Sequence, residues 1–295
     1  MDPTHEPVLL DEVIELLDPS RGGLFVDCTV GLGGHARAIL DAGATRLLGL
    51  DRDPVALEIA AQALAPWRDR VELVHADYRH LPAALATRGL DGIDGALADL
   101  GVSSMQFDAP GRGFSFRREE PLDMRMDQTS GPTAAQLIAD ADESDLADVI
   151  YRYGEERFSR RIARRMVEAR RTSPITTTTQ LADIVRRALP RKGYQRIDPA
   201  TRTFQALRIW VNRELDGLDV FLTAAARLLR RGARFAVITF HSLEDRVVKH
   251  TFRALAAGED AMRLLTKKPV VPDDRELARN PRARSAKLRA IERLV

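Results

Sequence analysis

Short apolar runs that alternate with helical segments are the feature of the first hundred residues that most restricts the fold. The apolar runs cover residues 24–27, 46–50, 71–75 and 94–99. Patterns of helical period cover residues 11–17, 35–42 and 54–64. Apolar runs this short are typical of buried strands rather than of buried helices. Strands that alternate with helices predict an α/β fold with a parallel sheet and crossover helices.

An aspartate stands at or just after the end of each apolar run. These residues are Asp27, Asp51, Asp77 and Asp99, and the hydroxyls of Ser103 and Ser104 follow the last of them. The carboxyl ends of parallel strands meet at one edge of the sheet, where open α/β proteins bind and react their ligands. Aspartates also occupy turns and helix caps, and for Asp77 both interpretations remain open.

A glycine-rich segment follows the first apolar run. Gly31, Gly33 and Gly34 precede a helical pattern, and glycine lets the backbone approach a ligand closely. Asp51 lies twenty positions after Gly31, the spacing at which a carboxylate accepts hydrogen bonds from a ribose diol. This order of elements fits a nicotinamide dinucleotide as well as S-adenosylmethionine. The acidic strand ends favour S-adenosylmethionine, because they would repel a pyrophosphate and attract a sulfonium and an ammonium group.

Composition excludes several classes of protein. The chain has 295 residues, of which 44% are hydrophobic, enough for one large core and a second module. Its single cysteine, Cys28, excludes an intramolecular disulfide and the usual zinc clusters, and the six histidines show no metal-ligand spacing. Neither a basic leader nor an apolar run of membrane-spanning length is present. We therefore expect a cytoplasmic protein that holds no metal and contacts no membrane.

The alternation of strands and helices stops after the fourth run. Residues 107–131 are rich in glycine, proline and arginine and predict a long functional loop. Residues 133–189 have a helical period throughout, in which we expect Ser144 as a cap, Gly154 as a stop and a basic helix over residues 155–171.

Strand character returns near the end of the chain. A predicted helix over residues 218–229, with a stop at Gly232, precedes a strand over residues 234–240, and residues 285–294 alternate as a final strand does. We therefore expect a sheet domain that is interrupted by an insertion. Its predicted parts are residues 1–106, the inserted loop and all-helical domain of residues 107–205, and residues 206–295.

Charge is unevenly distributed along the sequence. Residues 1–100 carry 8 arginines and lysines against 17 acidic residues, whereas residues 152–213 carry 16 against 5. A basic segment of this kind is typical of a solvated surface or of a protein that binds a polyanion. Over the whole segment the excess of positive charge favours nucleic acid as the partner.

Nine motifs, spread over nearly the full length, together resemble one known family. They are residues 31–35 (GLGGH), 50–54 (LDRDP), 99–104 (DLGVSS), 111–116 (GRGFSF), 121–126 (PLDMRM), 153–157 (YGEER), 201–206 (TRTFQA), 240–245 (FHSLED) and 280–285 (NPRARS). The set resembles the bacterial ribosomal RNA small subunit methyltransferase H family. The resemblance implies a class I, Rossmann-like methyltransferase domain with an inserted helical substrate domain. It also implies methyl transfer from S-adenosylmethionine to the exocyclic N4 of a cytosine in the decoding (P-site) region of 16S rRNA.

The resemblance also assigns cofactor contacts. They fall on Gly33, Gly34, His35, Asp51, Tyr78, Asp99 and Gln106. For catalysis we expect Asp99, Ser103 and Ser104, because N4 is a poor nucleophile that must be aligned with the donor and relieved of a proton. Either Asp99 or a neighbouring main-chain carbonyl accepts that proton, and Ser103 or Ser104 contacts the base edge.

Access to N4 requires an unstacked base, and aromatic and basic side chains suit that substrate. The candidate RNA contacts are Arg112, Phe114, Phe116, Arg117, Arg157, Arg161 and His241. Packing of the insertion explains the phenylalanines equally well, and His241 with the acidic residues after it also suits a helix cap. The expected partner is 16S rRNA, either naked or within the 30S subunit, and the family is compatible with a homodimer.

Two other functions remain open from the sequence. A nucleotide-dependent oxidoreductase would use the same glycine loop, because residues 31–36 also satisfy the dinucleotide fingerprint. A non-catalytic ribosome-binding protein would retain a methyltransferase-like fold without turnover. A comparison of NADH binding with S-adenosylmethionine binding would distinguish an oxidoreductase from a methyltransferase. Incubation with small subunits and labelled cofactor would distinguish a non-catalytic protein from an enzyme.

Overall fold

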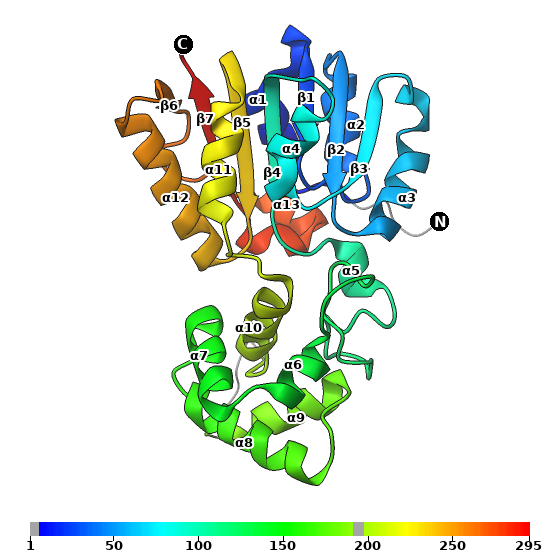
Figure 1. Cartoon of the computed structure of the whole chain (residues 1–295), viewed down its shortest axis with the longest axis vertical. Coiled ribbons are helices and arrows are strands. Elements are labelled where there is room, and N and C mark those ends of the chain that lie inside the picture. The colour runs from blue at the N-terminus through cyan, green and yellow to red at the C-terminus, as the bar shows by residue number, and fades with distance from the viewer. Residues whose placement is uncertain (1–5, 191–197) are drawn as a thin grey trace. The chain divides into compact units, whose positions relative to one another are not determined.

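The computed structural model describes residues 6–190 and 198–295. The chain divides into two compact units (Figure 1): unit 1 consists of Met1–Gly101 and Gly217–Val295, and unit 2 is Val102–Asp216. The domains expected from the sequence end after Gln106 and Gln205, and that division stays a prediction beside the two units. Each unit is described by itself below.

Unit 1 is built on one seven-stranded sheet. Its strands are β1 (Leu24–Asp27), β2 (Arg46–Asp51), β3 (Val71–His75), β4 (Ile93–Asp99), β5 (Leu229–Thr239), β6 (Met262–Leu264) and β7 (Lys287–Arg293). They are ordered β3-β2-β1-β4-β5-β7-β6. The first five are parallel, whereas β7 is antiparallel to both β5 and β6. The expected α/β class is confirmed.

The helices of unit 1 cover both faces of this sheet. They are α1 (Leu10–Leu17), α2 (Gly34–Asp41), α3 (Pro54–Ala63), α4 (Leu81–Ala86), α11 (Leu218–Arg227), α12 (Ser242–Ala257) and α13 (Asp274–Arg279). The 3₁₀ turns of this unit are η1 (Pro19–Arg21), η2 (Ala65–Trp67), η3 (Tyr78–His80) and η4 (Pro281–Ser285). In β5, the ring of Phe235 lies 6.0 Å from that of Phe221 in α11 and 5.7 Å from that of Phe252 in α12. The next residue, Ala236, belongs to the buried cluster that includes side chains of α1, α2 and α3. Because successive strand residues point to opposite faces, α11 and α12 cover one face and α1 to α3 the other.

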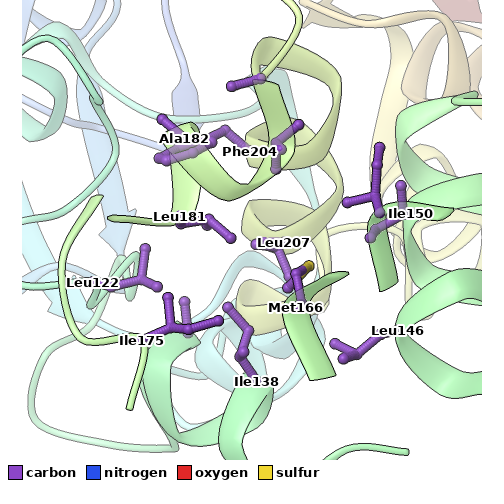
Figure 2. Close-up of a cluster of buried hydrophobic side chains, with 14 of the residues drawn as sticks. Leu122, Ile138, Leu146, Ile150, Met166, Ile175, Leu181, Ala182, Phe204 and Leu207 are labelled. Atoms are coloured by element: carbon purple, nitrogen blue, oxygen red, sulfur yellow. The ribbon is translucent and has the colours of Figure 1, made fainter. Parts of the chain in front are cut away.

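Unit 2 is helical and has its own core. Its helices are α5 (Ser104–Asp108), α6 (Ala134–Asp140), α7 (Glu143–Gly154), α8 (Ser159–Thr172), α9 (Thr178–Ala188) and α10 (Thr201–Asn212). Figure 2 shows apolar side chains of α6 to α10 meeting, among them Ile138, Leu146, Met166, Leu181 and Leu207. In α8 the buried side chains recur at one helix face and the arginines occupy the other, so this amphipathic helix stabilises the core while it presents positive charge outward.

Several predicted helix ends and caps were wrong. Helix α7 begins at Glu143 with Asp142 at the N-cap position, so Ser144 lies within its first turn and is no cap. The predicted stop at Gly154 is the last residue of α7, but the helix predicted over residues 155–171 begins only at Ser159, because Glu155 has the left-handed φ of 49°. Gly232 lies inside β5 and does not stop a helix, since pairing with β4 resumes on both sides of it.

The sequence predictions also left several elements out. Helices α4, α5, α10 and α13 and the short strand β6 have no counterpart among the predicted elements, and of α12 only a cap at its start was considered. Of the helices within residues 6–190 and 198–295, none combines the length and the apolar character that a bilayer crossing requires.

Candidate active site

Three of the predicted carboxylates lie on three adjacent strands of unit 1. The register pairs Asp27 of β1 with Gly49 of β2 and with Leu97 of β4, and both neighbouring strands end in aspartates, Asp51 and Asp99. These strands are parallel, so their carboxyl ends meet at one edge of the sheet. Backbone pairing, rather than loop conformation, therefore positions the three acids.

Two of these acids hold oxygen atoms for which the described part of the chain supplies no hydrogen-bond donor. Asp27 is 1% exposed; its Oδ1 accepts from the Thr29 N–H at 3.1 Å, and its Oδ2 has no partner. Asp99 donates its own N–H to Thr29 Oγ1 at 2.6 Å, and its buried Oδ1 has no partner. Buried polar atoms are nearly always hydrogen-bonded, so an exception calls for an explanation. A bound group that supplies donors or positive charge would provide one.

The surroundings of these acids disfavour their charged forms. Burial raises the pKa of Asp27 to about 7, and the negative charge of Asp51 adds to the shift against the hydrogen bond from Thr29. Burial also raises the pKa of Asp99 well above its ordinary value, helped by the charges of Asp27 and Glu244. Carboxylates that repel one another in a site of low polarity gain most from a nearby cation. The edge is therefore electrostatically suited to a positively charged ligand.

Asp51 connects this edge to the glycine loop. Its Oδ2 accepts from the Gly31 N–H at 2.8 Å, and its Oδ1 accepts from the Asp53 N–H at 2.9 Å. Burial raises the pKa of Asp51 although both hydrogen bonds lower it. Each carboxylate oxygen keeps a second lone pair, so the predicted contact with a ribose diol remains chemically open.

The glycines of the loop lie close to other atoms of unit 1. Gly33 has φ +86° at the N-cap of α2, a conformation that other residues rarely adopt. A Cβ atom on Gly34 would lie 2.5 Å from Pro7 Cγ. The packing of the loop against the N-terminal segment therefore requires glycine at residue 34 independently of any ligand.

His35 and Tyr78, both predicted to contact the cofactor, have partners within unit 1. His35 is buried, its Nε2 lies 3.0 Å from the Val8 carbonyl oxygen, and its Nδ1 lies 3.9 Å from Asp99 Oδ2. Because a carbonyl only accepts, Nε2 donates, and the ring is held with Nδ1 toward Asp99. Tyr78 is half-buried in η3, and its ring centroid lies 4.5 Å from that of Phe221.

Asp77 takes the capping role that the sequence left open. It is the N-cap of η3, accepts from the Arg79 N–H at 3.0 Å, and forms an ion pair with the Arg79 guanidinium at 2.6 Å. Burial alone would raise its pKa, but the hydrogen bonds and charge of Arg79, with Arg52 nearby, bring the pKa below its usual value. Asp77 thus differs from Asp27 and Asp99, with which no lysine or arginine pairs within residues 6–190 and 198–295.

His241 lies at the N-terminus of α12 and is part of a capping box. Its Nδ1 accepts from the Glu244 N–H at 3.3 Å, and Glu244 Oε2 accepts from the backbone of His241. The cap interpretation of this segment is therefore confirmed, with His241 at the cap position. The His241 side chain is only 6% exposed. Its role as an RNA contact stays a prediction.

In unit 2, the residues predicted beside Asp99 begin α5. Ser103 is the N-cap, with its Oγ accepting from the Gln106 N–H at 3.3 Å while Gln106 Oε1 accepts from the Ser103 N–H at 3.0 Å. Ser104 is the first residue of the helix, and its side chain lies outside what the structure describes. The polar groups of Ser103 and Gln106 thus stabilise the start of a short helix, and their catalytic and cofactor roles stay predictions.

The arginines and phenylalanines of the predicted loop fall into two groups. Arg112 and Phe114 are each 5% exposed, and Arg112 Nη2 donates to the Met126 carbonyl at 2.7 Å. Arg117 is exposed, and Phe116 is partly exposed against Phe204, with ring centroids 4.7 Å apart. The first pair holds the loop from inside, whereas the second pair is accessible to a ligand.

The loop is further fixed by a clamp that sequence patterns did not reveal. Asn212, at the end of α10, accepts from the Met126 N–H at 2.7 Å and donates to the Met124 carbonyl at 2.8 Å. Met124 has the left-handed φ of 62°, so its segment needs such an external support. Nothing in the local sequence around either end signals a contact across more than eighty residues.

Exposed arginines gather at and before the start of α8. Arg157, Arg160 and Arg161 are exposed and, within the part of the chain that the structure describes, form no ion pair with a carboxylate. Arg164 and Arg165 of the same helix do pair, with Glu143 at 3.6 Å and Glu168 at 2.7 Å. The predicted contacts Arg157 and Arg161 therefore keep their charge available.

The acidic start of the chain shares unit 1 with the closing segment. The acidic first hundred residues and the basic closing segment supply strands to the same sheet, with β4 and β5 side by side. The strongly basic residues 152–213 belong to unit 2, and their expected contact with nucleic acid stays a prediction. The sequence also did not single out Thr29, whose hydroxyl binds Asp99, or Glu244, whose charge raises the pKa of Asp99.

Comparison with known proteins agrees with this geometry. The model of the MraW methylase family matches residues 2–294. The chain is 51% identical to the ribosomal RNA small subunit methyltransferase H of Bradyrhizobium diazoefficiens, over 98% of this chain and 91% of that protein. It is 50% identical to the protein of the same name from Geobacter sulfurreducens, over 99% of both chains, and 52% identical to that of Deinococcus radiodurans, over 98% and 90%. The chain therefore belongs to the MraW methylase family and is a methyltransferase.

Proposed function

We propose that this chain transfers a methyl group from S-adenosylmethionine to the exocyclic N4 of a cytosine in the decoding region of 16S rRNA. Family membership and the names of the relatives support the methyl transfer to small-subunit ribosomal RNA. The observation in the structure that carries the proposal is at the β1–β4 edge, where one buried oxygen each of Asp27 and Asp99 has no hydrogen-bond partner among the described residues.

The residues of this edge fit the proposed methyl donor. S-adenosylmethionine supplies an electrophilic methyl carbon on a positively charged sulfur. Asp27 and Asp99 supply the negative charge for the cationic end, Asp51 keeps lone pairs for the ribose hydroxyls, and Gly33 and Gly34 bring backbone close without side chains. Half-buried Tyr78 offers the remainder of its ring to the adenine, with Gln106 as the further contact that the family implies.

Asp99 is the residue we place at the reacting amine. An amino group conjugated with a pyrimidine ring becomes more nucleophilic as its proton is transferred to an acceptor. The unpartnered Asp99 Oδ1 is such an acceptor, and its raised pKa makes it a stronger base than an ordinary aspartate. His35 holds its ring toward Asp99 Oδ2 and leaves Oδ1 for the amine. Ser103 and Ser104 contact the edge of the base in this proposal.

The RNA is held by accessible side chains of unit 2. Arg117, Arg157 and Arg161 contact phosphates, and Phe116 provides a stacking surface for an unstacked base. Arg112 and Phe114 act from the interior by holding the loop that carries Phe116 and Arg117. We place the reaction in the cytoplasm, on 16S rRNA within the assembled 30S subunit, with a homodimer as the expected assembly.

Nucleoside mass spectrometry tests this function directly. The protein is incubated with labelled S-adenosylmethionine and either naked 16S rRNA or 30S subunits that lack the modification, and the RNA is digested to nucleosides. We expect labelled N4-methylcytidine with the 30S subunit. Label in a different nucleoside, or no label with either substrate, would reject the proposal. Calorimetry with NADH and S-adenosylmethionine separates it from an oxidoreductase, which would bind NADH.

A further inference from the structure

A hollow with a strongly positive lining lies on the α12 side of unit 1, apart from the acidic edge. It is shallow, and it lies among α12, β6 with the residues after it, and β7. Its lining residues are Lys249, Phe252, Arg253, Leu264, Thr266, Lys267 and Arg289. Four of these seven side chains are cationic and none is acidic.

Three of the four cations have no acidic partner in the described part of the chain. Among residues 6–190 and 198–295, no carboxylate pairs with Lys249, Arg253 or Lys267. Other cations of the same region do pair, for example Arg227 with Asp260 at 2.8 Å and Lys287 with Asp245 at 3.2 Å. Lys249 and Arg253 are one helical turn apart, and like charges at this spacing weaken a helix. The fold therefore keeps these positive charges close together although they repel one another.

The inner wall of the hollow carries a buried guanidinium and a hydroxyl. Arg289 of β7 is 6% exposed and donates Nε–H to Asp245 Oδ1 at 2.7 Å, which fixes the plane of its guanidinium. Its two Nη groups donate no hydrogen bond within the described chain. Thr266 Oγ1 accepts from the Ala290 N–H at 2.9 Å, so its own proton is left to donate outward. Fixed donors on the inner wall and cationic side chains at the rim are the groups that an anion requires.

We propose that this hollow binds a backbone phosphate of the RNA substrate. A phosphodiester oxygen accepts several charge-assisted hydrogen bonds at once, which suits the Arg289 guanidinium, the Thr266 hydroxyl and the surrounding cations. Arg253 and Lys267 are exposed and Lys249 is half-buried, as expected for a contact with a long polyanion rather than for an enclosed small anion. The proposal rests on the proposed function for the identity of the polymer, and it adds a second phosphate-binding surface outside unit 2.

A matched set of lysine and arginine variants tests this site. Affinity for a 16S rRNA fragment is measured by filter binding at several salt concentrations for the wild type, K249Q/R253Q/K267Q and the control K268Q, which removes a neighbouring lysine that does not line the hollow. We expect about tenfold weaker RNA binding for the triple variant, equivalent to the loss of one charge-assisted hydrogen bond, and a salt slope shallower by about 0.7. S-adenosylmethionine affinity and the melting temperature should match those of K268Q.

A second arm uses inorganic phosphate as the probe. The amide resonances of Thr266 and Ala290 are followed while phosphate is added, and we expect shifts in the wild type and in K268Q that the triple variant loses. Equal RNA affinity of the triple variant and K268Q would overturn the proposal, whether or not phosphate binds. Absence of N4-methylcytidine in the wild type would instead reject the proposed function, while weaker RNA binding by the triple variant alone would still support the phosphate site.

Discussion

Unit 1 contains two groups of like-charged side chains, one of buried acids and one of cations that reach solvent. Asp27 and Asp99 hold buried oxygens at the carboxyl ends of β1 and β4, without donors in the described chain. Lys249, Arg253 and Lys267 have no carboxylate partner there either, but they reach solvent at the rim of the hollow. Burial makes the first group costly to ionise, whereas water stabilises the second at little cost. The acids should therefore control chemistry and pH response, and the cations should control only salt-dependent affinity.

The most severe test of this comparison removes one buried acid. We expect Asp99→Asn to lower the rate of methyl transfer by 10²- to 10⁴-fold, the range for loss of a group that accepts a proton. Turnover of 30S subunits with labelled donor measures the effect. Asp91→Asn, at the amino end of β4 in an exposed ion pair with Arg230, is the matched control and should keep full activity. Equal activity of the two variants would contradict the role of Asp99.

The second test concerns stability and uses Asp27. Its pKa is raised from 3.8 to about 7 in the folded chain, so between these values the folded state holds a proton that the unfolded state has lost. Stability should therefore fall as the pH rises through this window and stay low above it, by up to about 4 kcal/mol. Asp27→Asn removes the penalty, and we expect a higher melting temperature at pH 8 with little difference at pH 4. A variant less stable than the wild type at pH 8 would show that the carboxylate is compensated.

The third test links the same proton to cofactor binding. A cationic ligand favours the ionised form of Asp27, so its binding should release a proton below pH 7. We expect the affinity for S-adenosylmethionine to rise by up to tenfold per pH unit up to about pH 7 and then to level off. Calorimetry in buffers of different ionisation enthalpy measures the released proton. An affinity that does not change from pH 5.5 to 8 would separate Asp27 from the cationic end of the ligand.

The smallest expected effect belongs to the solvated cations of unit 2. Replacement of Arg157 and Arg161 by glutamine should make the salt slope of RNA binding shallower by about 1.4, from about 0.7 per phosphate contact. R164Q/R165Q, whose arginines pair with Glu143 and Glu168, is the control and should change the slope less. Indistinguishable slopes for the two double variants would mean that ion pairing does not decide which arginines contact phosphate.

The sheet and its acidic edge could be predicted largely from the sequence. Strands β1 and β3 have the predicted limits, and β2 and β4 differ by one residue, because short apolar runs leave a buried strand few alternatives. The strand ends carry Asp27, Asp51 and Asp99, so the edge followed from the order of elements alone. The raised pKa values did not, since their largest cause is burial, which depends on how the folded chain covers each carboxylate.

Features fixed by contacts distant in sequence could not be predicted. Asn212 clamps the backbone at Met124 and Met126, and Gly232 lies within a strand because β4 pairs on both sides of it. Local signals gave these residues other roles or none. The hollow could not be predicted either, because Arg289 and Thr266 come together only when β7 packs beside the segment after β6.

The insertion of unit 2 between two paired strands has a consequence for the nascent chain. Strand β4 ends at Asp99, but its parallel neighbour β5 begins only at Leu229, after the whole of residues 102–216. During translation, the edge of β4 that pairs with β5 keeps its backbone N–H and C=O groups unpaired until the ribosome has synthesised residues 102–216 and then β5. Such an exposed strand invites pairing with other chains. A nascent polypeptide arrested just before β5 should therefore be the form of this protein most dependent on chaperones.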